Sequence, residues 1–374
     1  MLLFKKVSYI AVSALLLTAT GCSKFDDINI NPNEAAQPVT SALLTNVETT
    51  LPGLGMPSNL SYYVQYYSQI QYPAEQLYTL TNIGWDATYN NPLKDLQSII
   101  ELNTAKPDQW ASTGNTINQT QIARILRAYI YMTLTDRYGD IPYSQAVKGE
   151  SKVAYDKQQD IYTDLFKELR EAIAAFQSTG EPIKGDIIYG GNLAKWKRFA
   201  NSLRMVMAMN LSEVAPTTSR TEFLAALNDP NGFITENTDN FALKYPGGSF
   251  NHPYYNLTGA SALALSGTVS DKLNPINDPR VKAFGQASGG AVKGIPYGLD
   301  RANNLNWTDD NPDYSLLYAT EHKQRTSTAT ILPASYVYLL RAEAALNYGT
   351  GENAYDLLKS AVEKSFAQWN VTGN

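Results

Sequence analysis

Two segments of the chain place a tryptophan among polar side chains that could bind the hydroxyl groups of a sugar. The first segment spans residues 82–90 around Trp85, and the second spans residues 304–314 around Trp307. Flat aromatic faces stack on the C–H faces of sugar rings, while amide and carboxylate groups form hydrogen bonds with hydroxyls. The two tryptophans are the expected stacking faces. The predicted ligand-binding residues are Trp85, Asn82, Asp86, Tyr89, Trp307, Asn306, Asp309 and Tyr314.

Each tryptophan also has a purely structural interpretation. Trp85 could anchor the start of a helix by packing into a scaffold, and Trp307 could be a loop aromatic folded onto its own lobe. Both alternatives remain open. Tyrosine is the unusual residue in the composition, with 25 Tyr against 11 Phe and 5 Trp. A tyrosine can serve in a wet binding surface, or pack between helices with its hydroxyl at the surface.

The residues that catalysis would need are scarce. His252 and His322 are the only two histidines, and neither stands in a metal-ligand spacing. The sequence contains no nucleophile elbow, phosphate loop or cysteine–histidine pair. The acidic cluster Asp309-Asp310-x-x-Asp313 could serve a glycosidase or a Ca²⁺ site, but it equally fits a solvated loop, which we favour. The sequence therefore predicts a protein that is not an enzyme and has no metal site and no cofactor.

The single cysteine, Cys22, closes a segment typical of a bacterial lipoprotein signal. A basic tip with Lys5 and Lys6 precedes an apolar run over residues 7–17, and small residues lead to the cysteine. The apolar run is too short for a comfortable membrane span, so residues 1–21 are predicted to be a cleaved signal peptide. Cys22 is then the lipid-attachment site that fixes the protein to a membrane. The alternative is an ordinary secretory signal followed by a chance cysteine.

Charge and length narrow the remaining classes. The net charge is −5, and removal of residues 1–21 takes away two lysines and leaves −7. A mildly acidic chain does not support nucleic-acid binding, which needs a basic surface. With one cysteine, stability must come from packing rather than from disulfides.

The elements that position these residues are mainly helical. Apolar stripes at helical spacing predict helices over 89–103, 118–135, 156–176, 192–211 and 334–346, with another beginning at 354. Asp156 and Asn192 are the expected N-caps of the third and fourth of these helices. Tyr62, Tyr63, Tyr66 and Tyr67 also recur at helical spacing and are predicted to pack.

Residues 229–333 have a different character. Gly, Pro, Asn, Ser and Asp are frequent, helical periodicity is lost, and aromatic residues are numerous. Long ordered loops of this kind are usually functional, so we predict an irregular ligand-binding lobe here. Around the turn at Gly349 and Gly351, the last two helices have alanines at helical spacing and resemble a tetratricopeptide hairpin.

Several segments occur in order along the chain: the lipobox ending at Cys22, 136–144 (DRYGDIPYS), Tyr155-Asp156 with Ile161, Tyr162 and Leu165, 193–204 (LAKWKRFANSLR), 278–280 (DPR) and 338–344 (YLLRAEA). Together these segments resemble the SusD/RagB family of Bacteroidetes outer-membrane nutrient-binding lipoproteins. The resemblance implies a mainly α fold, with a scaffold of four tetratricopeptide-like helix pairs and an irregular lobe that carries the ligand site. It further implies that the protein is not an enzyme, binds a glycan or another nutrient, and sits on a TonB-dependent outer-membrane barrel. Asp26-Asp27 resembles the acidic signal that sends such lipoproteins to the cell surface.

The predicted organisation is a signal peptide over 1–21, a tether over 22–40, and a SusD-like α domain over 41–374 that contains the lobe 229–333. The family continues past the helix near Trp369, so the C-terminal region is expected to be truncated. The predicted function is a lipid-anchored, cell-surface protein of the outer membrane that captures a glycan or other oligomeric nutrient and delivers it to a TonB-dependent transporter. The alternatives are a protein–protein adaptor of an outer-membrane complex and a secreted glycoside hydrolase.

Overall fold

A computed structural model of the protein describes residues 39–55, 58–79, 84–110, 113–149, 152–257, 262–287 and 289–373. Cys22, the acidic pair Asp26-Asp27 and the predicted site residue Asn82 therefore lie outside the described residues. The chain from Thr40 onward forms one compact unit. In these described ranges, no helix combines the length and the hydropathy needed to cross a membrane.

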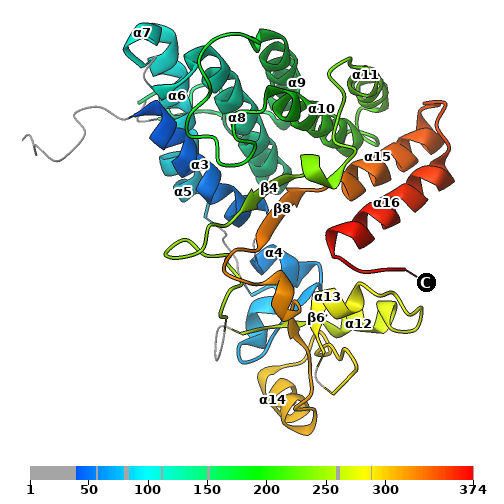
Figure 1. Cartoon of the computed structure of the whole chain (residues 1–374). Helices are drawn as coiled ribbons and strands as arrows, with labels where there is room; N and C mark the ends of the chain where they lie inside the picture. The colour runs from blue at the N-terminus through cyan, green and yellow to red at the C-terminus, as the bar shows by residue number, and fades with distance from the viewer. Residues whose placement is uncertain are drawn as a thin grey trace, which may run out of the picture. The chain divides into compact units, whose positions relative to one another are not determined.

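Within the described residues, eight long helices build a scaffold (Figure 1). Consecutive helices pack as hairpins, α8 on α9, α10 on α11 and α15 on α16, while α3 packs on α6 and α6 on α8. The mainly α, tetratricopeptide-like scaffold is confirmed. The long helices are α3 (Thr40–Gly55), α6 (Lys94–Ala105), α8 (Thr116–Tyr138), α9 (Gln158–Ala175), α10 (Leu193–Asn210), α11 (Pro216–Leu227), α15 (Ala334–Asn347) and α16 (Ala354–Gln368). Shorter turns are α5 (Asp86–Thr88), a π-helical turn (Tyr89–Leu93), α7 (Pro107–Trp110) and the 3₁₀ turns Pro73–Gln76, Asn237–Asp239 and Thr320–His322.

The apolar stripes of these helices face one core. The residues of the α9 stripe, from Ile161 to Ala172, are buried, and Trp196 of α10 is fully enclosed. Phe199 of α10 stacks on Phe241 with ring centroids 3.8 Å apart, and Trp196 meets the same ring edge-on at 6.1 Å. Aromatic packing of this kind joins the helices to the strand that carries Phe241.

One of the two predicted N-caps is confirmed and one is wrong. Asn192 caps α10 by accepting a hydrogen bond from the backbone N–H of Lys195. In α9 the N-cap position falls on Lys157. The backbone N–H of Gln158 at the start of α9 instead donates to the carboxylate of Asp140, which lies just after α8, at 2.9 Å. Asp156 instead holds the turn at residues 143–144 through two backbone N–H groups and the Ser144 hydroxyl.

The segment predicted to be irregular contains regular elements as well as loops. A four-stranded sheet has the order β1-β5-β7-β6, and its first strand comes from far earlier in the chain. Tyr62 is buried beside this sheet and Tyr67 is buried within its first strand, whereas Tyr66 is exposed. The expected tyrosine helix therefore ends at Tyr63. The lobe is therefore built from 58–79 together with 245–327. Its elements are α4 (Ser58–Tyr63), β1 (Tyr67–Gln69), β5 (Leu263–Leu265), α12 (Gly267–Leu273), α13 (Val281–Phe284), β6 (Gly285–Gln286), α14 (Arg301–Asp310) and β7 (Leu316–Leu317).

Two antiparallel strands join this lobe to the scaffold. Strand β4 (Phe241–Lys244) leaves α11, and β8 (Thr328–Leu332) returns to α15 alongside it. Both strands place buried side chains on one face, among them Phe241 and Leu243 on β4 and Ala329 on β8. The chain thus enters and leaves the insert at one place (Figure 1).

Candidate functional site

The loop after α8 forms the base of one candidate site. Gly139 ends α8 with a φ of +75°, a left-handed conformation that glycine adopts without a Cβ clash. The chain then forms β2 (Ile141–Pro142), which pairs with β3 (Tyr155–Asp156) so that Pro142 lies opposite Tyr155. This short ladder presents the ring of Tyr155 beside the start of α5.

Trp85 lies at the centre of an aromatic cluster on this base. Its ring centroid is 4.8 Å from that of Tyr138 and 6.1 Å from that of Tyr89, both at steep angles. Tyr155 lies 5.8 Å away with its ring tilted by 50°, and 61% of it is exposed. Trp85 is therefore both an anchor on the scaffold and part of an accessible aromatic surface. We call Trp85, Asp86, Tyr89, Asn90 and Tyr155 the Trp85 surface.

Polar groups border the aromatic rings of the Trp85 surface. A cavity of about 400 Å³ opens there, and Asp86, Asn90 and Lys94 line it together with apolar residues of the loop 142–155. The hydroxyl of Tyr89 is already used, because it donates to the carbonyl of Pro142 at 2.6 Å. Burial raises the pKa of Tyr89, so this group stays neutral and serves to fix the surface. Asp86 and Asn90 are exposed and remain the groups suited to sugar hydroxyls.

The structure brings together three of the predicted site residues, Trp85, Asp86 and Tyr89. Sequence reasoning did not assign Tyr155 to the site, although it noted the residue as part of a motif. Tyr155 reaches the site because segment 155–156 pairs with segment 141–142. Two-residue strands are too short to show strand periodicity in the sequence.

The second predicted segment lies on a different part of the molecule. Residues 304–314 were expected to form a loop, but most of them belong to α14, whose N-cap Asp300 accepts the N–H of Asn303. Trp307 and Tyr314 are partly buried against a small apolar cluster of the lobe, while Asn306 and Asp309 are exposed. These residues pack on a different cluster from the one beneath Trp85.

The acidic cluster that ends α14 is spread out. Asp309 and Asp310 are exposed, and the carboxylate of Asp313 lies 3.3 Å from the ammonium of Lys293. Within the described residues, no three acidic, histidine or cysteine side chains are grouped closely enough to hold a metal ion.

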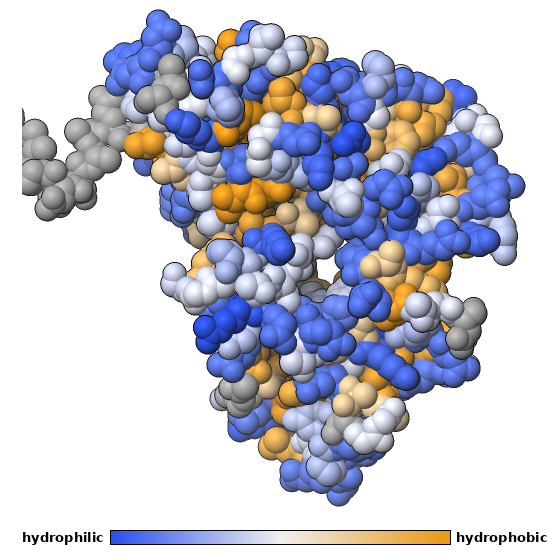
Figure 2. Space-filling model, in the orientation of Figure 1, coloured by the Kyte–Doolittle hydropathy of each residue, from blue (hydrophilic) through white to orange (hydrophobic). Residues whose placement is uncertain are grey.

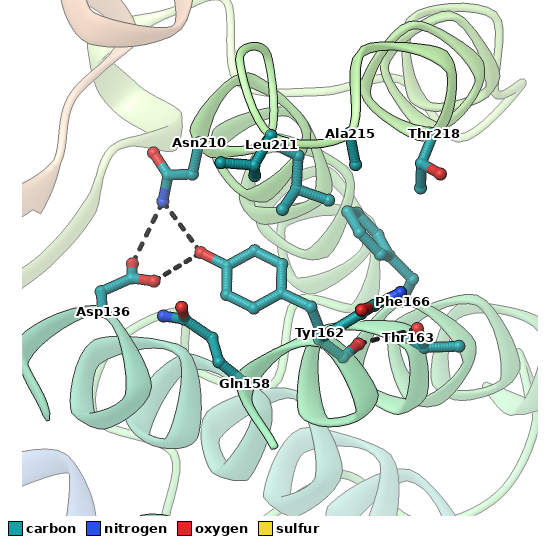
Figure 3. A pocket seen from close by; sticks show the side chains of 11 residues that line it. Asp136, Gln158, Tyr162, Thr163, Phe166, Asn210, Leu211, Ala215 and Thr218 are labelled. Atoms are coloured by element: carbon teal, nitrogen blue, oxygen red, sulfur yellow. Dashed lines mark hydrogen bonds between the residues drawn. The ribbon is translucent and has the colours of Figure 1, made fainter. Parts of the chain in front are cut away.

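A larger groove, of about 720 Å³, lies between α9 and α11 (Figure 3). At its polar end Asn210 donates to Asp136 and to Tyr162, each at 3.1 Å, and the Tyr162 hydroxyl also donates to Asp136. Burial raises the pKa of Asp136. These polar groups satisfy one another, and the rest of the lining is mixed. It combines Gln158, Gln159, Thr163 and Thr218 with Phe166, Leu211, Ala215 and Val214, which is 80% exposed. Figure 2 shows hydrophobic residues near α11 and α15 on this face.

Comparison with known proteins decides the family. A family model, SusD-like_2, described as "Starch-binding associating with outer membrane", matches residues 32–374. The chain belongs to the SusD-like family. No curated protein sequence matches it.

Solved structures of SusD-like proteins share the fold. A chitin-binding protein is 27% identical, with a TM-score of 0.73 over 88% of this chain and 75% of its own. A chitin-binding SusD homologue from Flavobacterium johnsoniae is 23% identical, with a TM-score of 0.72 over 89% of this chain and 70% of its own. A SusD homologue from Bacteroides fragilis is 22% identical, with a TM-score of 0.74 over 89% and 74%. The resemblance inferred from the motifs is thereby confirmed.

Proposed function

We propose that this SusD-like protein is a lipid-anchored binding protein of the cell surface that captures a glycan and delivers it to a TonB-dependent outer-membrane transporter. The observation that carries the glycan part is the Trp85 surface, where two accessible aromatic rings stand beside exposed polar groups. The chitin-binding relative makes chitin oligosaccharides the first ligands to test.

The geometry of the Trp85 surface suggests how a glycan would bind. The rings of Trp85 and Tyr155 are tilted by 50° to each other, so a ligand that contacts both must present two sugar faces with a bend between them. Asp86 and Asn90 would then bind hydroxyls at the edges of the rings. Binding of this kind needs no catalytic group.

Replacing Trp85 with alanine should weaken oligosaccharide binding about tenfold or more. Truncating an aromatic anchor typically costs about 2 kcal/mol, and a tenfold change in affinity corresponds to about 1.4 kcal/mol. Calorimetry with chitin and starch oligosaccharides would measure the change. Because Trp85 also packs on Tyr138, the more exposed Tyr155→Ala variant provides a second test with less effect on folding.

The control for these variants is Tyr355→Ala, which removes a tyrosine that is 75% exposed on α16. Trp307→Ala tests the second predicted segment in the same assay. Full affinity in both the Trp85 and the Tyr155 variants would remove this surface from the binding site.

The anchor makes a separate prediction. Cys22→Ala should abolish retention at the cell surface, because the acyl chains on this residue would supply the membrane anchor, while ligand affinity stays unchanged. Protease accessibility on intact cells and cell fractionation would measure surface retention of the wild-type and Cys22→Ala proteins. Continued surface display of the Cys22→Ala protein would contradict the lipoprotein assignment.

Delivery requires a partner that the anchor keeps nearby. Two proteins held in one membrane meet at a raised effective concentration, so a modest contact suffices for transfer. Co-purification of a TonB-dependent barrel with the lipidated protein would support this step. Purification with a barrel but with no glycan bound under any condition would favour an adaptor instead, and turnover of a glycan panel would favour a hydrolase.

A further inference from the structure

A second cavity, of about 360 Å³, lies beside the lobe residues that follow β7 and the end of α16. We call it the histidine cavity, because it gathers both histidines of the chain although they are 70 positions apart. None of the residues predicted from the sequence to bind ligand lines it. The lining residues used below are His252, Tyr318, His322, Thr328, Thr330 and Trp369.

One wall of the histidine cavity is aromatic and rigid. Trp369, at the C-cap of α16, stacks on Tyr318 with centroids 5.4 Å apart and an interplanar angle of 24°. His322 and Phe284 meet the indole edge-on at 5.1 and 5.0 Å. The indole is therefore held from several sides, and the wall is formed before any ligand arrives.

Tyr318 holds a strained backbone conformation at this wall. Its φ is +55°, in the left-handed region that residues with a Cβ rarely occupy. Its hydroxyl lies 2.9 Å from that of Tyr67 on β1, which fixes the ring from the opposite end. Strain of this kind persists where the surrounding packing over-determines a residue, and such residues cluster at binding sites.

His252 brings a hydrogen-bonding imidazole to the lining of the cavity. Its Nδ1 accepts the backbone N–H of Tyr254 at 3.3 Å, so in the neutral ring the proton sits on Nε2. His252 is 4% exposed and lines the cavity. Burial also lowers the pKa of His252 to about 4, which keeps the ring neutral near pH 7.

Hydroxyl groups form a further part of the lining. Thr328 and Thr330 flank the buried Ala329 on β8 and therefore project from the same face of the strand. Among the described residues that line the cavity, Glu321 is the one carboxylate, and it is exposed at the surface. The lining thus offers neutral donors and acceptors beside an aromatic wall, and it suits a ligand that carries hydroxyls and no charge.

We propose that the histidine cavity is a second binding site that takes one neutral, hydroxylated ring such as a single pyranose unit. Its volume lies near the lower end of the range for small-molecule pockets, roughly 300–1,000 Å³, which is sufficient for one ring unit. The ligand class rests on the proposed function, but the site is separate from the Trp85 surface. His252 Nε2 and the threonine hydroxyls bind the ring hydroxyls in this site.

Monosaccharide titrations test this site. N-acetylglucosamine and glucose are the probes, and ligand-observed NMR with the full chain gives the affinities. His252→Phe and Thr330→Val each remove a hydrogen-bonding group and retain similar bulk, and each should weaken monosaccharide binding roughly tenfold. Thr221→Val, an exposed change on α11, is the matched control and should bind as the wild type does.

The variants also separate this site from the first. Trp85→Ala should lose oligosaccharide affinity and keep monosaccharide binding, whereas Thr330→Val should show the reverse order of effects. Absence of monosaccharide binding to the wild-type chain would overturn the proposal, as would wild-type affinity in a folded Thr330→Val protein. If His252→Phe does not fold, the Thr330→Val result alone decides. If Trp85→Ala keeps full oligosaccharide affinity while Thr330→Val weakens monosaccharide binding, the proposed function is contradicted and the histidine cavity remains a binding site.

Discussion

An Asp186→Ala variant should lose about 3–5 kcal/mol of unfolding free energy. Asp186 is buried in the loop before α10, and its carboxylate accepts four hydrogen bonds. Three come from the backbone N–H groups of Ile188, Tyr189 and Gly191, and the fourth comes from the indole of Trp196 at 2.7 Å. Alanine would leave these donors without a partner, including one in the centre of the scaffold core.

Urea denaturation followed by tryptophan fluorescence measures this loss. Asp309→Ala removes an exposed carboxylate and is the matched control. Trp196→Phe removes only the indole bond of the same network and part of the ring, so it should cost less than Asp186→Ala if the carboxylate is the organising group. A loss below about 1 kcal/mol for Asp186→Ala would show that water or a neighbouring group replaces the carboxylate.

A Glu48→Gln variant should become more stable than the wild type as the pH rises. Glu48 of α3 is fully buried, and one of its oxygens accepts the N–H of Ile187 at 2.6 Å while the other has no donor. Burial first, and then the negative charge of Asp186, raise the pKa of Glu48 well above its usual range. When the free oxygen of Glu48 is protonated, its O–H can donate a hydrogen bond toward Asp186.

The sign of the pH effect follows from proton binding. Above the pKa of the unfolded chain, near 4.5, the folded protein keeps the Glu48 proton and the unfolded chain releases it. The contribution of Glu48 to the free energy of unfolding of the wild type is therefore fully present below that pH. It falls as the pH rises toward the folded pKa, by up to about 1.4 kcal/mol per pH unit. Glutamine has no such proton, so this slope disappears and the advantage of the variant grows with pH.

Unfolding free energies at several pH values between 5 and 8.5 test the Glu48 prediction. Glu213→Gln, which changes an exposed glutamate after α10, controls for the loss of one negative charge. Wild-type and Glu48→Gln curves that run parallel over this range would mean that Glu48 is ionised in the folded protein.

The scaffold could be predicted because its information is local. Helices such as α8 and α9 carry apolar stripes over 23 and 18 residues, long enough for a period of 3.6 to stand out. The Asp156 cap failed for a non-local reason, since Asp140 from the preceding turn reaches the same helix start. The lobe was predicted poorly because its strands have two or three residues and pair with segments up to about 200 positions away.

The sites follow the same division. Trp85, Asp86 and Tyr89 were found because they are neighbours in sequence and lie together in the structure. Tyr155 joins them only through a two-residue strand pair. The histidine cavity was invisible for a stronger reason, because His252, His322 and Trp369 meet only when three distant segments pack together. Spacing along the chain has no signal for such a set.

The pairing of β1 with β5 has a consequence for engineering new specificities. Because β4 and β8 lie side by side, residues 245–327 look like a cassette that could be exchanged between homologues at two nearby junctions. Yet β1, which lies outside that cassette, supplies an edge strand of the sheet. Tyr62 and Tyr67, also outside the cassette, belong to the apolar cluster that packs with residues of β5. A chimera that carries only the later segment would meet a foreign strand at this edge. A functional graft must therefore transplant residues 58–79 as well, so that both segments are inherited as one unit.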